Sequence, residues 1–479
     1  MGDPQTEKST GNRGVWIAFG ALLTLGIALR LAGSVFSQGF VHPDEHQQYL
    51  EVAQGIVYGP HVRWWEYERG TRHYFYPYCL ALLLTGLDAL GVRDPIHQAT
   101  AIRALLGIAL FAGLALLARD WLRQGRVAGA FCLLAGAALS SDIVYMSVRT
   151  SSETAATIPL IFCLYLHKRD PFLTGLLLGI AFAIRFQMAF FIPGFIALSL
   201  YDDWSAQRGW KGSTGRMAAG LGLALIAAGL MDKVTWGEWF HSPLECFRAN
   251  ILEGIAAKYG VGPWYQYLVW GGELLAQAVP LLGLLFIALG ARREKRAAFL
   301  GLVFLIGHSV IARKDQRFLW PLAPLLLVLF AAGFETSYRW LRDGWERRAL
   351  IAALSCCLLG GCWFRFAELD WNPEPARASS QALAKLGKYH DLTGVLVFHL
   401  PSAECGNYFY LRRDVPLLVN DITDPSDPTI HALWKSGTIN YLIAWPKDAA
   451  RLTNYQLEEV DLVHGLGIFK INRQRAARP

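Results

Sequence analysis

Two adjacent acids, Asp44 and Glu45, follow an apolar run that is long enough to cross a bilayer. The run covers residues 14–36, and the acids lie in the stretch FVHPDEHQQYLEVAQG, residues 40–55. Pro43 suits the first position of a helix, and acids in a first turn complement the helix dipole. A carboxylate at a water-filled cavity on the membrane surface can also act as general base on a hydroxyl. The residue types alone allow both roles.

The neighbours of the two acids favour the chemical role, because packing does not need them. These neighbours are polar or aromatic side chains that could bind a ligand beside the acids: His42, His46, Gln48, Trp65, Glu66 and Arg72. Apolar residues recur at helical spacing between Tyr49 and Val57. This spacing predicts a helix that lies on the membrane surface with its apolar stripe toward the lipid.

Several cations elsewhere in the chain could bind a phosphate and so complement the acids. Arg149 lies in SVRTSSE, Arg185 interrupts an apolar segment, and RKDQRFLWP contains Arg313, Lys314 and Arg317. An arginine fork binds two phosphate oxygens at once. Each cation alone could instead be an interfacial residue that extends its charge into water. Together with the acids, they predict a site that binds a lipid phosphate and activates a hydroxyl.

The composition indicates that these residues are positioned by membrane-spanning helices. Hydrophobic residues make up 53% of the 479 residues, charged residues 17%, and the mean hydropathy is +0.29. These values are typical of a polytopic membrane protein. The net charge of +7 fits cytoplasmic loops that face anionic lipid, and no basic run alternates with aromatics as nucleic-acid binding would require.

The chain contains no glycine-rich phosphate loop, dinucleotide fingerprint, HExxH motif or Cys/His metal cluster. We therefore expect neither a metal cofactor nor a soluble nucleotide-sugar donor. A lipid-linked phosphate donor in the membrane fits better.

The orientation of the spans follows from the basic loops, which stay in the cytoplasm. Apolar runs occur at 14–36, 98–118, 127–147, 153–167, 171–200, 216–232, 263–290, 296–312, 317–338 and 347–366. The strongly basic loops are 118–126, 167–170, 206–216, 291–296 and 338–348. All of them become cytoplasmic if 74–91 is a juxtamembrane or re-entrant helix on the outer side and 171–200 contains two short helices, broken near Arg185 and before Pro193. The result is about eleven transmembrane helices with an extracytoplasmic C-terminus.

This topology divides the chain into three parts. Residues 1–13 are expected to form a cytoplasmic tail without a cleavable signal, and 14–366 the transmembrane catalytic module, with 37–97 as its first extracytoplasmic loop. Residues 367–479 contain short β-like runs such as GVLVFHL and INYLIAW, and a helix-like stretch at 379–390. They predict a small extracytoplasmic α/β domain.

Three motifs jointly resemble those of glycosyltransferase family 22, the polyprenyl- or dolichyl-phosphate-mannose-dependent mannosyltransferases, and above all its GPI type. They are HPDEHQQYLEVAQGIVYG with WWEYERGTRHYFYP, then VRTSSET, and then HSVIARKDQRFLWPLAP. The resemblance covers roughly residues 14–325. It implies an all-α, polytopic GT-C-type fold with outer juxtamembrane helices. It also implies inverting transfer of mannose, or a related sugar, from a polyprenyl-phosphate donor to a hydroxyl of a glycan or glycolipid, without a metal.

The resemblance assigns roles to individual residues. Asp44 would deprotonate the acceptor, Glu45 would orient it or share that role, and His308, Lys314 and Arg317 would stabilise the departing phosphate. The side chains named above as neighbours of the acids are then expected to bind the acceptor or the sugar. Arg313 replaces a usual histidine, so we do not expect it to act as acid or base.

The predicted source organism and cellular membrane rest on a single feature of the sequence. The chain contains no Asn-x-Ser/Thr sequon, which favours a bacterial source. We then expect the inner membrane, with the active site facing the periplasm, or the ER membrane if the source is eukaryotic.

Two other functions are compatible with parts of the pattern. A transporter or flippase for lipid-linked glycans would need paired inverted segments with broken helices, and only 171–200 looks broken. A non-catalytic scaffold predicts that Asp44 and Glu45 can be replaced without consequence.

Overall fold

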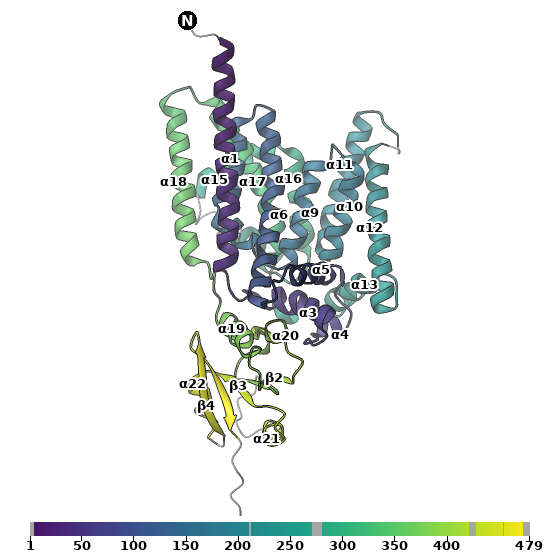
Figure 1. Ribbon diagram of the computed structural model, residues 1–479. Helices are drawn as coiled ribbons and strands as arrows, with labels where there is room; N and C mark the ends of the chain where they lie inside the picture. Colours follow the sequence, from purple (N-terminus) through teal and green to yellow (C-terminus); the bar gives the residue numbers. More distant parts are fainter. Residues whose placement is uncertain (1–3, 210–211, 271–279, 421–427, 454, 473–479) are drawn as a thin grey trace, which may run out of the picture. The chain divides into compact units, whose positions relative to one another are not determined.

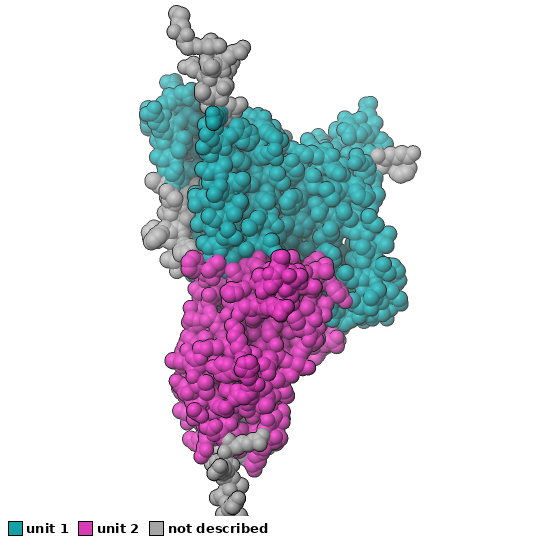
Figure 2. All heavy atoms as spheres, viewed as in Figure 1, with its two compact units in different colours: residues 1–34, 69–75, 103–369 teal, residues 35–68, 76–102, 370–479 magenta. Residues whose placement is uncertain are grey.

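The computed structural model describes residues 4–209, 212–270, 280–420, 428–453 and 455–472. The chain divides into two compact units (Figure 2). Unit 1 consists of Met1–Ser34, Arg69–Phe75 and Arg103–Leu369, and unit 2 of Val35–Glu68, Tyr76–Ile102 and Asp370–Pro479. Most of the predicted loop 37–97 therefore belongs to the same unit as the C-terminal region, a grouping that the sequence did not predict.

Unit 1 is helical, and its long helices run side by side (Figure 1). Its helices are α1 (Pro4–Phe36), α6 (Pro95–Arg123, which begins in unit 2), α7 (Val127–Leu139), α8 (Ser141–Ser147), α9 (Ser152–Leu166), α10 (Pro171–Ile184), α11 (Phe191–Ser205), α12 (Ser213–Trp236), α13 (His241–Phe247), α15 (Pro280–Arg293), α16 (Lys295–Val310), α17 (Ala323–Trp340) and α18 (Trp345–Glu368). Its 3-10 and π turns are η2 (Phe186–Phe190), η3 (Arg248–Leu252), η4 (Ile255–Tyr259) and η5 (Gln316–Leu322).

Several of these helices are long and apolar enough to cross a membrane. Among the described residues there are four, within Arg13–Phe36, Pro95–Arg123, Ser213–Trp236 and Gln316–Trp340, or five if α7 and α8, bent by 60°, form one span. Shorter apolar helices include α9 and α10. The helices follow the predicted apolar runs, although part of the run at 263–290 lies outside the described residues. The number of about eleven spans stays a prediction.

The predicted break in the run 171–200 is confirmed. Helix α10 ends at Ile184, and Arg185 is extended with φ −150° and ψ 113°. The 3-10 turn η2 follows, and α11 begins at Phe191, before Pro193. Arg185 thus lies at the end of a helix inside an apolar segment, which is a position where a broken helix can expose a cation to a cavity.

Small residues allow α10 and α12 to pack closely. A Cβ atom on Gly175 would lie 1.9 Å from the Met217 carbonyl oxygen, and one on Gly220 would lie 2.0 Å from that of Phe172. Both distances exclude any side chain, so the two backbones touch through glycine, as is common between membrane helices.

The five basic loops gather at one end of unit 1, which we call the basic-loop end. Arg126 binds Glu294 at 2.7 Å and Glu335 at 2.8 Å, and Arg296 binds Asp202 at 2.7 Å. The pairs Arg169–Asp120, Arg216–Asp170 and Arg339–Glu335 join the remaining loops. This arrangement agrees with the parity argument that placed these loops on one side.

Unit 2 combines the helices of the predicted first loop with a small sheet. Its helices and turns are α2 (Pro43–Glu45), η1 (His46–Leu50), α3 (Glu51–Tyr58), α4 (Trp65–Glu68), α5 (Phe75–Ala89), α19 (Ala376–Leu386), η6 (Ser402–Glu404), α20 (Asn407–Leu411), α21 (Pro428–Lys435) and α22 (Pro446–Ala449). Its strands are β1 (Val395–Phe398), β2 (Leu417–Asn420), β3 (Tyr441–Ala444), β4 (Gln456–Val463) and β5 (Leu466–Asn472).

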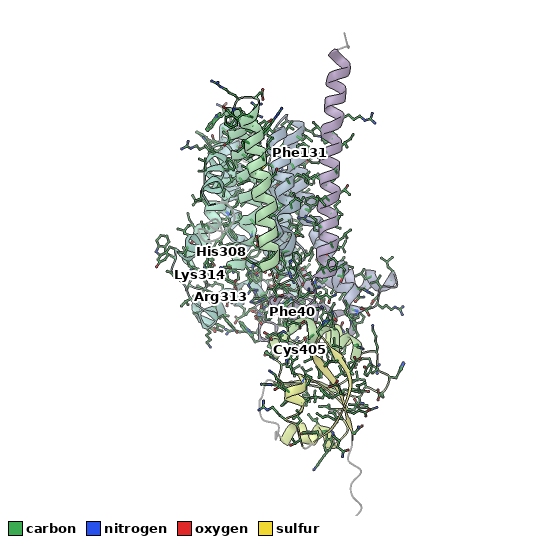
Figure 3. All side chains as sticks on the ribbon, turned by 90° about the vertical axis from the view of Figure 1, so that its left-hand side faces the viewer. Phe40, Phe131, His308, Arg313, Lys314 and Cys405 are labelled. Carbon is green, nitrogen blue, oxygen red and sulfur yellow. The ribbon has the colours of Figure 1, made fainter. Side chains whose placement is uncertain are left out.

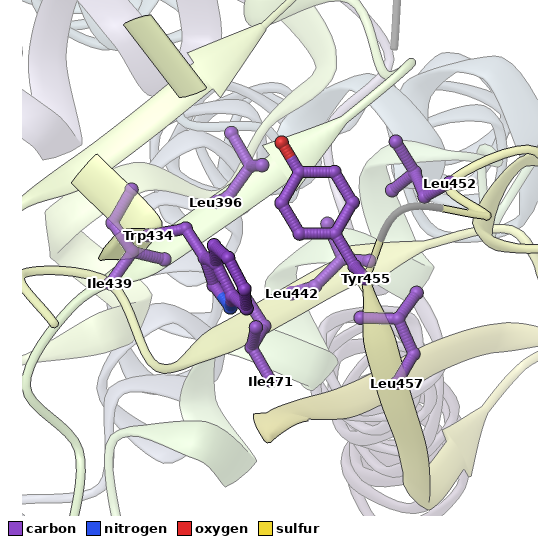
Figure 4. Close-up of a pocket in the computed structure, with 8 residues that line it drawn as sticks. All are labelled: Leu396, Trp434, Ile439, Leu442, Leu452, Tyr455, Leu457 and Ile471. Carbon is purple, nitrogen blue, oxygen red and sulfur yellow. The ribbon is translucent and has the colours of Figure 1, made fainter. Parts of the chain in front are cut away.

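The sheet has the order β2-β1-β3-β5-β4. β1 is parallel to β2 and β3, whereas β5 is antiparallel to β3 and β4. One face packs on an apolar cluster that includes Leu396, Trp434, Leu442 and Ile471, and Figure 4 shows these side chains lining a small crevice. The α/β character predicted for the C-terminal region is confirmed. Strand β4 was not predicted, because its residues alternate charge with only partial burial.

The apolar stripe after the acids does not face outward as we expected. Tyr49, Leu50 and Ala53 are buried in unit 2, and the Tyr49 ring lies 4.9 Å from that of Tyr76. The stripe therefore forms part of a protein core instead of a lipid-facing surface.

Candidate active site

The acid segment begins as the sequence predicts. Pro43 starts the short helix α2, and His42 caps it, with its Nδ1 accepting a hydrogen bond from the Asp44 backbone N–H at 3.2 Å. A π-helical turn, η1, follows directly and leads into α3. Asp44 and Glu45 thus occupy a first helical turn, and the side chain of Glu45 is buried. Single π-helical turns are frequent at functional sites.

Gln48 holds two carboxylates with one amide group. Its Nε2 donates to Asp44 Oδ1 at 2.8 Å and to Glu66 Oε1 at 2.7 Å. Because ionised carboxylates only accept, this pair of contacts fixes which end of the amide faces the acids. The Gln48 Oε1 atom is buried and has no hydrogen-bond partner. The segment therefore presents an orientated acid, Asp44, next to an acceptor oxygen of Gln48.

The other side chains predicted to bind the acceptor or sugar lie in different surroundings. His46 is 0% exposed, and its Nε2 lies 2.9 Å from the carbonyl oxygen of Gly406. Its ring stacks on Phe40 at 4.8 Å. Trp65 begins α4 and is half-buried, whereas Arg72 belongs to unit 1. The structure gives His46 a contact with the C-terminal region that the sequence did not suggest.

A buried carboxylate, Glu153, binds two of the predicted cations of unit 1. It lies in the first turn of α9 and is 1% exposed. Arg185 reaches it with Nη2 at 3.0 Å and donates to Ser152 Oγ at 2.7 Å. Arg317 lies 3.5 Å from the same oxygen and 3.0 Å from Asp315. Three segments that are far apart in sequence thus bring two guanidinium groups onto one carboxylate.

Lys314, Arg313 and His308 extend this group, and Figure 3 shows them near one another at one end of unit 1. Lys314 donates to the backbone carbonyls of Ser309 and Ile311 at the end of α16. Burial lowers the pKa of its amine below the usual value. Among the described residues, no carboxylate pairs with Lys314.

Aromatic rings support the remaining members of this group. The Arg313 guanidinium lies 5.2 Å from the Tyr259 ring centre, and that of Arg149 lies 4.1 Å from Tyr145. His308 is 1% exposed, and its Nδ1 lies 3.3 Å from the Phe304 carbonyl oxygen. Because a carbonyl only accepts, Nδ1 carries the proton and donates it there. We call these residues the cation end of unit 1: Arg149, Arg185, His308, Arg313, Lys314 and Arg317.

The predicted site residues divide between the units. His42, Asp44, Glu45, His46, Gln48, Trp65 and Glu66 belong to unit 2, and Arg72 and the cation end belong to unit 1. In unit 2 Gln48 binds Asp44 and Glu66, and in unit 1 Glu153 binds Arg185 and Arg317, whereas the other predicted groups have different partners. In the described part of the chain, no group of three or more His, Cys, Asp or Glu side chains could hold a metal ion.

Sequence reasoning missed Glu153 and Gln47. An acid at the start of an apolar helix is usually read as a complement to the helix dipole, and this hid the role of Glu153. Gln47 contacts residues 402–407, which no local pattern links to it. The signal for Glu153 was present in the sequence, as an acid and an arginine that both interrupt apolar segments.

Comparisons with known proteins identify the family of this chain. The model of the Alg9-like mannosyltransferase family matches residues 21–366. Mannosyltransferase APTG1 of Arabidopsis thaliana is 26% identical over 64% of this chain and 57% of its own length. GPI alpha-1,2-mannosyltransferase 3 of Danio rerio is 26% identical over 70% of this chain and 62% of its own length. The chain thus spans about three fifths of the length of these curated relatives.

Two solved structures have folds similar to that of this chain. ArnT from Cupriavidus metallidurans, crystallised with undecaprenyl phosphate, has a TM-score of 0.61 at 13% identity and covers 97% of this chain and 99% of that one. The oligosaccharyltransferase of Archaeoglobus fulgidus has a TM-score of 0.51 at 13% identity, covering 89% of this chain and 67% of that one. The fold is therefore of the GT-C type, as expected, in a multi-pass membrane protein.

Proposed function

This chain belongs to the Alg9-like mannosyltransferase family, and from this premise we propose that it transfers a mannosyl unit from a polyprenyl-phosphate donor to a hydroxyl of a glycan or glycolipid. The observation that carries the proposal is the acid segment inside the matched region, where Gln48 holds Asp44 at 2.8 Å. The cation end lies in the same matched region and supplies groups suited to a phosphate.

In the proposed reaction, the oxygen of the acceptor hydroxyl attacks the anomeric carbon of the donor while Asp44 removes the proton of that hydroxyl. A positioned base of this kind contributes about 10²–10⁴ to the rate. The hydrogen bond from Gln48 fixes one oxygen of Asp44, which keeps the carboxylate orientated during proton transfer. The buried Glu45, next to it, shares or orients this step.

The leaving group is the lipid phosphate, which gains negative charge as the glycosidic bond breaks. Arg317, Lys314 and Arg185 are proposed to stabilise that charge, since preorganised cations in a site with little water are effective there. They need little reorganisation, because Glu153 and backbone carbonyls already hold them in place. The proposal includes no metal.

Attack from the face opposite the phosphate inverts the anomeric centre. A β-linked donor would then give an α-linked product, in agreement with the name of the Danio rerio relative. The proposed location of the site is the extracytoplasmic face, since the basic-loop end collects the loops that the positive-inside rule assigns to the cytoplasm. We infer a bacterial inner membrane from the missing sequons; the relatives named above are eukaryotic.

The test uses purified protein in detergent or nanodiscs, a synthetic polyprenyl-phosphate mannose and a panel of mannosyl and glycolipid acceptors. We expect Asp44→Asn to lower kcat by about 10²–10⁴-fold without loss of folding. Asp94→Asn is the matched control, because Asp94 lies in the same predicted loop, caps α6 and pairs with Lys388. Asparagine can replace it as a cap.

Three outcomes would contradict parts of the proposal. Full activity of Asp44→Asn would remove Asp44 as the base. A retained β-configuration in the product, read by NMR, would exclude direct inversion. Translocation of a lipid-linked glycan into liposomes by the Asp44→Asn variant, with no transfer by the wild type, would favour the flippase alternative.

A further inference from the structure

Gln47 lies directly between the acid segment and the C-terminal region, and it uses both ends of its amide. Its Nε2 donates toward the carbonyl oxygens of Cys405 at 2.9 Å and of Ser402 and Ala403 at 3.3 Å. Its Oε1 accepts from Asn407 Nδ2 at 2.6 Å and from Trp64 Nε1 at 3.0 Å. Carbonyls only accept and an indole N–H only donates, so the amide has one possible orientation.

The residues on either side of Gln47 in η1 and α3 strengthen the same attachment. His46 contacts the Gly406 carbonyl at 2.9 Å. Glu51 is 0% exposed and accepts from the backbone N–H groups of Phe409 at 2.8 Å and Tyr408 at 3.2 Å. One continuous helical stretch thus binds the whole segment 402–409.

The segment 402–409 is itself held firmly by the rest of the C-terminal region. Ser379 of α19 donates to the Glu404 carbonyl at 2.8 Å. A Cβ atom on Gly406 would lie 2.8 Å from the Ser380 Cα, which leaves no room for a side chain there. A shift of this segment would therefore need a rearrangement of α19.

Gln48, the next residue, holds the acids. It donates to Asp44 and Glu66 from the same π-helical turn that carries Gln47. A rotation or translation of this turn would move both glutamines together. The position of Asp44 is thus linked through two adjacent side chains to residues 402–407.

We propose that Gln47 is a positioning residue, through which the C-terminal region sets the orientation of the acid segment. This gives a function to residues 367–479, which lie beyond the region that the family model matches. The inference rests on the proposed function, in that it assigns Asp44 as the group to be positioned.

The test separates hydrogen-bond donation from size. Gln47→Glu keeps the shape of the side chain and the acceptor for Asn407 and Trp64, but turns a carboxylate oxygen toward carbonyl oxygens. We expect it to lower kcat by about 10²-fold, at least as much as Gln47→Ala, because small displacements of reacting groups have effects of this size. The KM for the donor should stay within about threefold. Wild-type kcat in Gln47→Glu would overturn the proposal.

Gln98 provides the matched control. It is also a buried glutamine that joins the predicted first loop to the C-terminal region. Its Nε2 donates to Asp88 at 2.7 Å, and its Oε1 accepts from the Arg412 guanidinium. None of its hydrogen bonds with described residues involves η1. We expect Gln98→Ala to keep kcat within about threefold. An equal loss of kcat in Gln98→Ala and Gln47→Ala would show that docking in general, and not Gln47, is responsible, and would overturn the assignment.

Hydrogen exchange of peptide 402–411 gives a readout that needs no enzymatic activity. Gln47→Glu should exchange faster there than the wild type, and unchanged exchange would contradict the proposed attachment. If the wild type transfers no mannose while this exchange difference is present, the proposed function fails and the attachment stands. If the wild type is active and both readouts are unchanged, the positioning role alone fails.

Discussion

The two ends of unit 1 hold their cations in different ways. At the basic-loop end several arginines pair with carboxylates, as in the pairs of Arg126 with Glu294 and Glu335 and of Arg296 with Asp202. At the cation end Arg185 and Arg317 share Glu153, Lys314 binds backbone carbonyls, and Arg313 and Arg149 lie over aromatic rings. Similar residue types are therefore held by different kinds of partner at the two ends.

The difference suggests which arginines stabilise and which could bind a ligand. The cation end has three cations, Arg185, Arg317 and Lys314, for two carboxylates, Glu153 and Asp315, whereas at the basic-loop end Arg126 alone binds both Glu294 and Glu335. Backbone carbonyls orient Lys314 without cancelling its charge. The basic-loop end resembles a network that joins helices. The cation end resembles a preorganised anion site, consistent with the proposed lipid phosphate.

The strongest test compares the central carboxylates of the two ends. Glu153 and Glu335 are each 1% exposed and each bind more than one arginine. We expect Glu153→Gln and Glu335→Gln each to destabilise the fold, by less than the about 3–5 kcal/mol of a fully buried pair, since Arg317 keeps Asp315 and Arg126 keeps Glu294. Thermal unfolding in detergent measures this. Only Glu153→Gln should also lower kcat per folded molecule; equal kcat in both variants would contradict the distinction.

Single arginines should sharpen the same contrast. We expect Arg317→Met to lower kcat/KM by about 10²–10³-fold, because it removes a cation proposed to stabilise the leaving phosphate. Arg296→Met is the control at the basic-loop end, where the pair with Asp202 should affect stability but not kcat/KM. Arg317→Lys should recover part of the loss. A similar loss of activity in the two methionine variants would argue against a phosphate site at the cation end.

Lys314 should make the activity sensitive to alkaline pH. An ordinary lysine has a pKa of about 10.4. Burial lowers the pKa of Lys314 below this value, so Lys314 loses its charge at a lower pH. As the pH rises through that pKa, kcat/KM should fall by about tenfold per pH unit. Lys314→Arg should remove this alkaline limb, since arginine stays protonated. A pH profile of the wild type and the variant between pH 7 and 10 measures it, and an unchanged limb in Lys314→Arg would assign it to another group.

Local patterns predicted much of the fold but only part of the site. Proline before two acids predicted the start of α2, and a charged residue inside an apolar run predicted the break at Arg185. Runs of β-branched and aliphatic residues predicted β1 and β3. These features follow from neighbours in the sequence, so the sequence contains them directly.

The contacts that join distant segments could not be predicted in this way. Gln47 binds a segment in the C-terminal region, and Glu153 binds two arginines from other helices. Glutamine is a common surface residue, and a single acid at a helix start has an ordinary explanation. Only the fold shows that Gln47 and Glu153 are buried and that their polar atoms bind distant segments, and this is why they were missing from the predicted site.

The smallest expected effect lies at the edge of the basic-loop end. Arg216 and Asp170 are 3.7 Å apart, with side chains 58% and 43% exposed. Water screens such a pair, so Arg216→Gln should change the free energy of unfolding by about 0.5 kcal/mol or less and leave kcat unchanged. Denaturation of the purified variant beside Arg296→Met measures the difference. If Arg216→Gln lowered the free energy of unfolding as much as Arg296→Met does, the ion pairs of the basic-loop end would act as one cooperative network. The two ends would then differ in how their charges are coupled, and not in the strength of individual pairs.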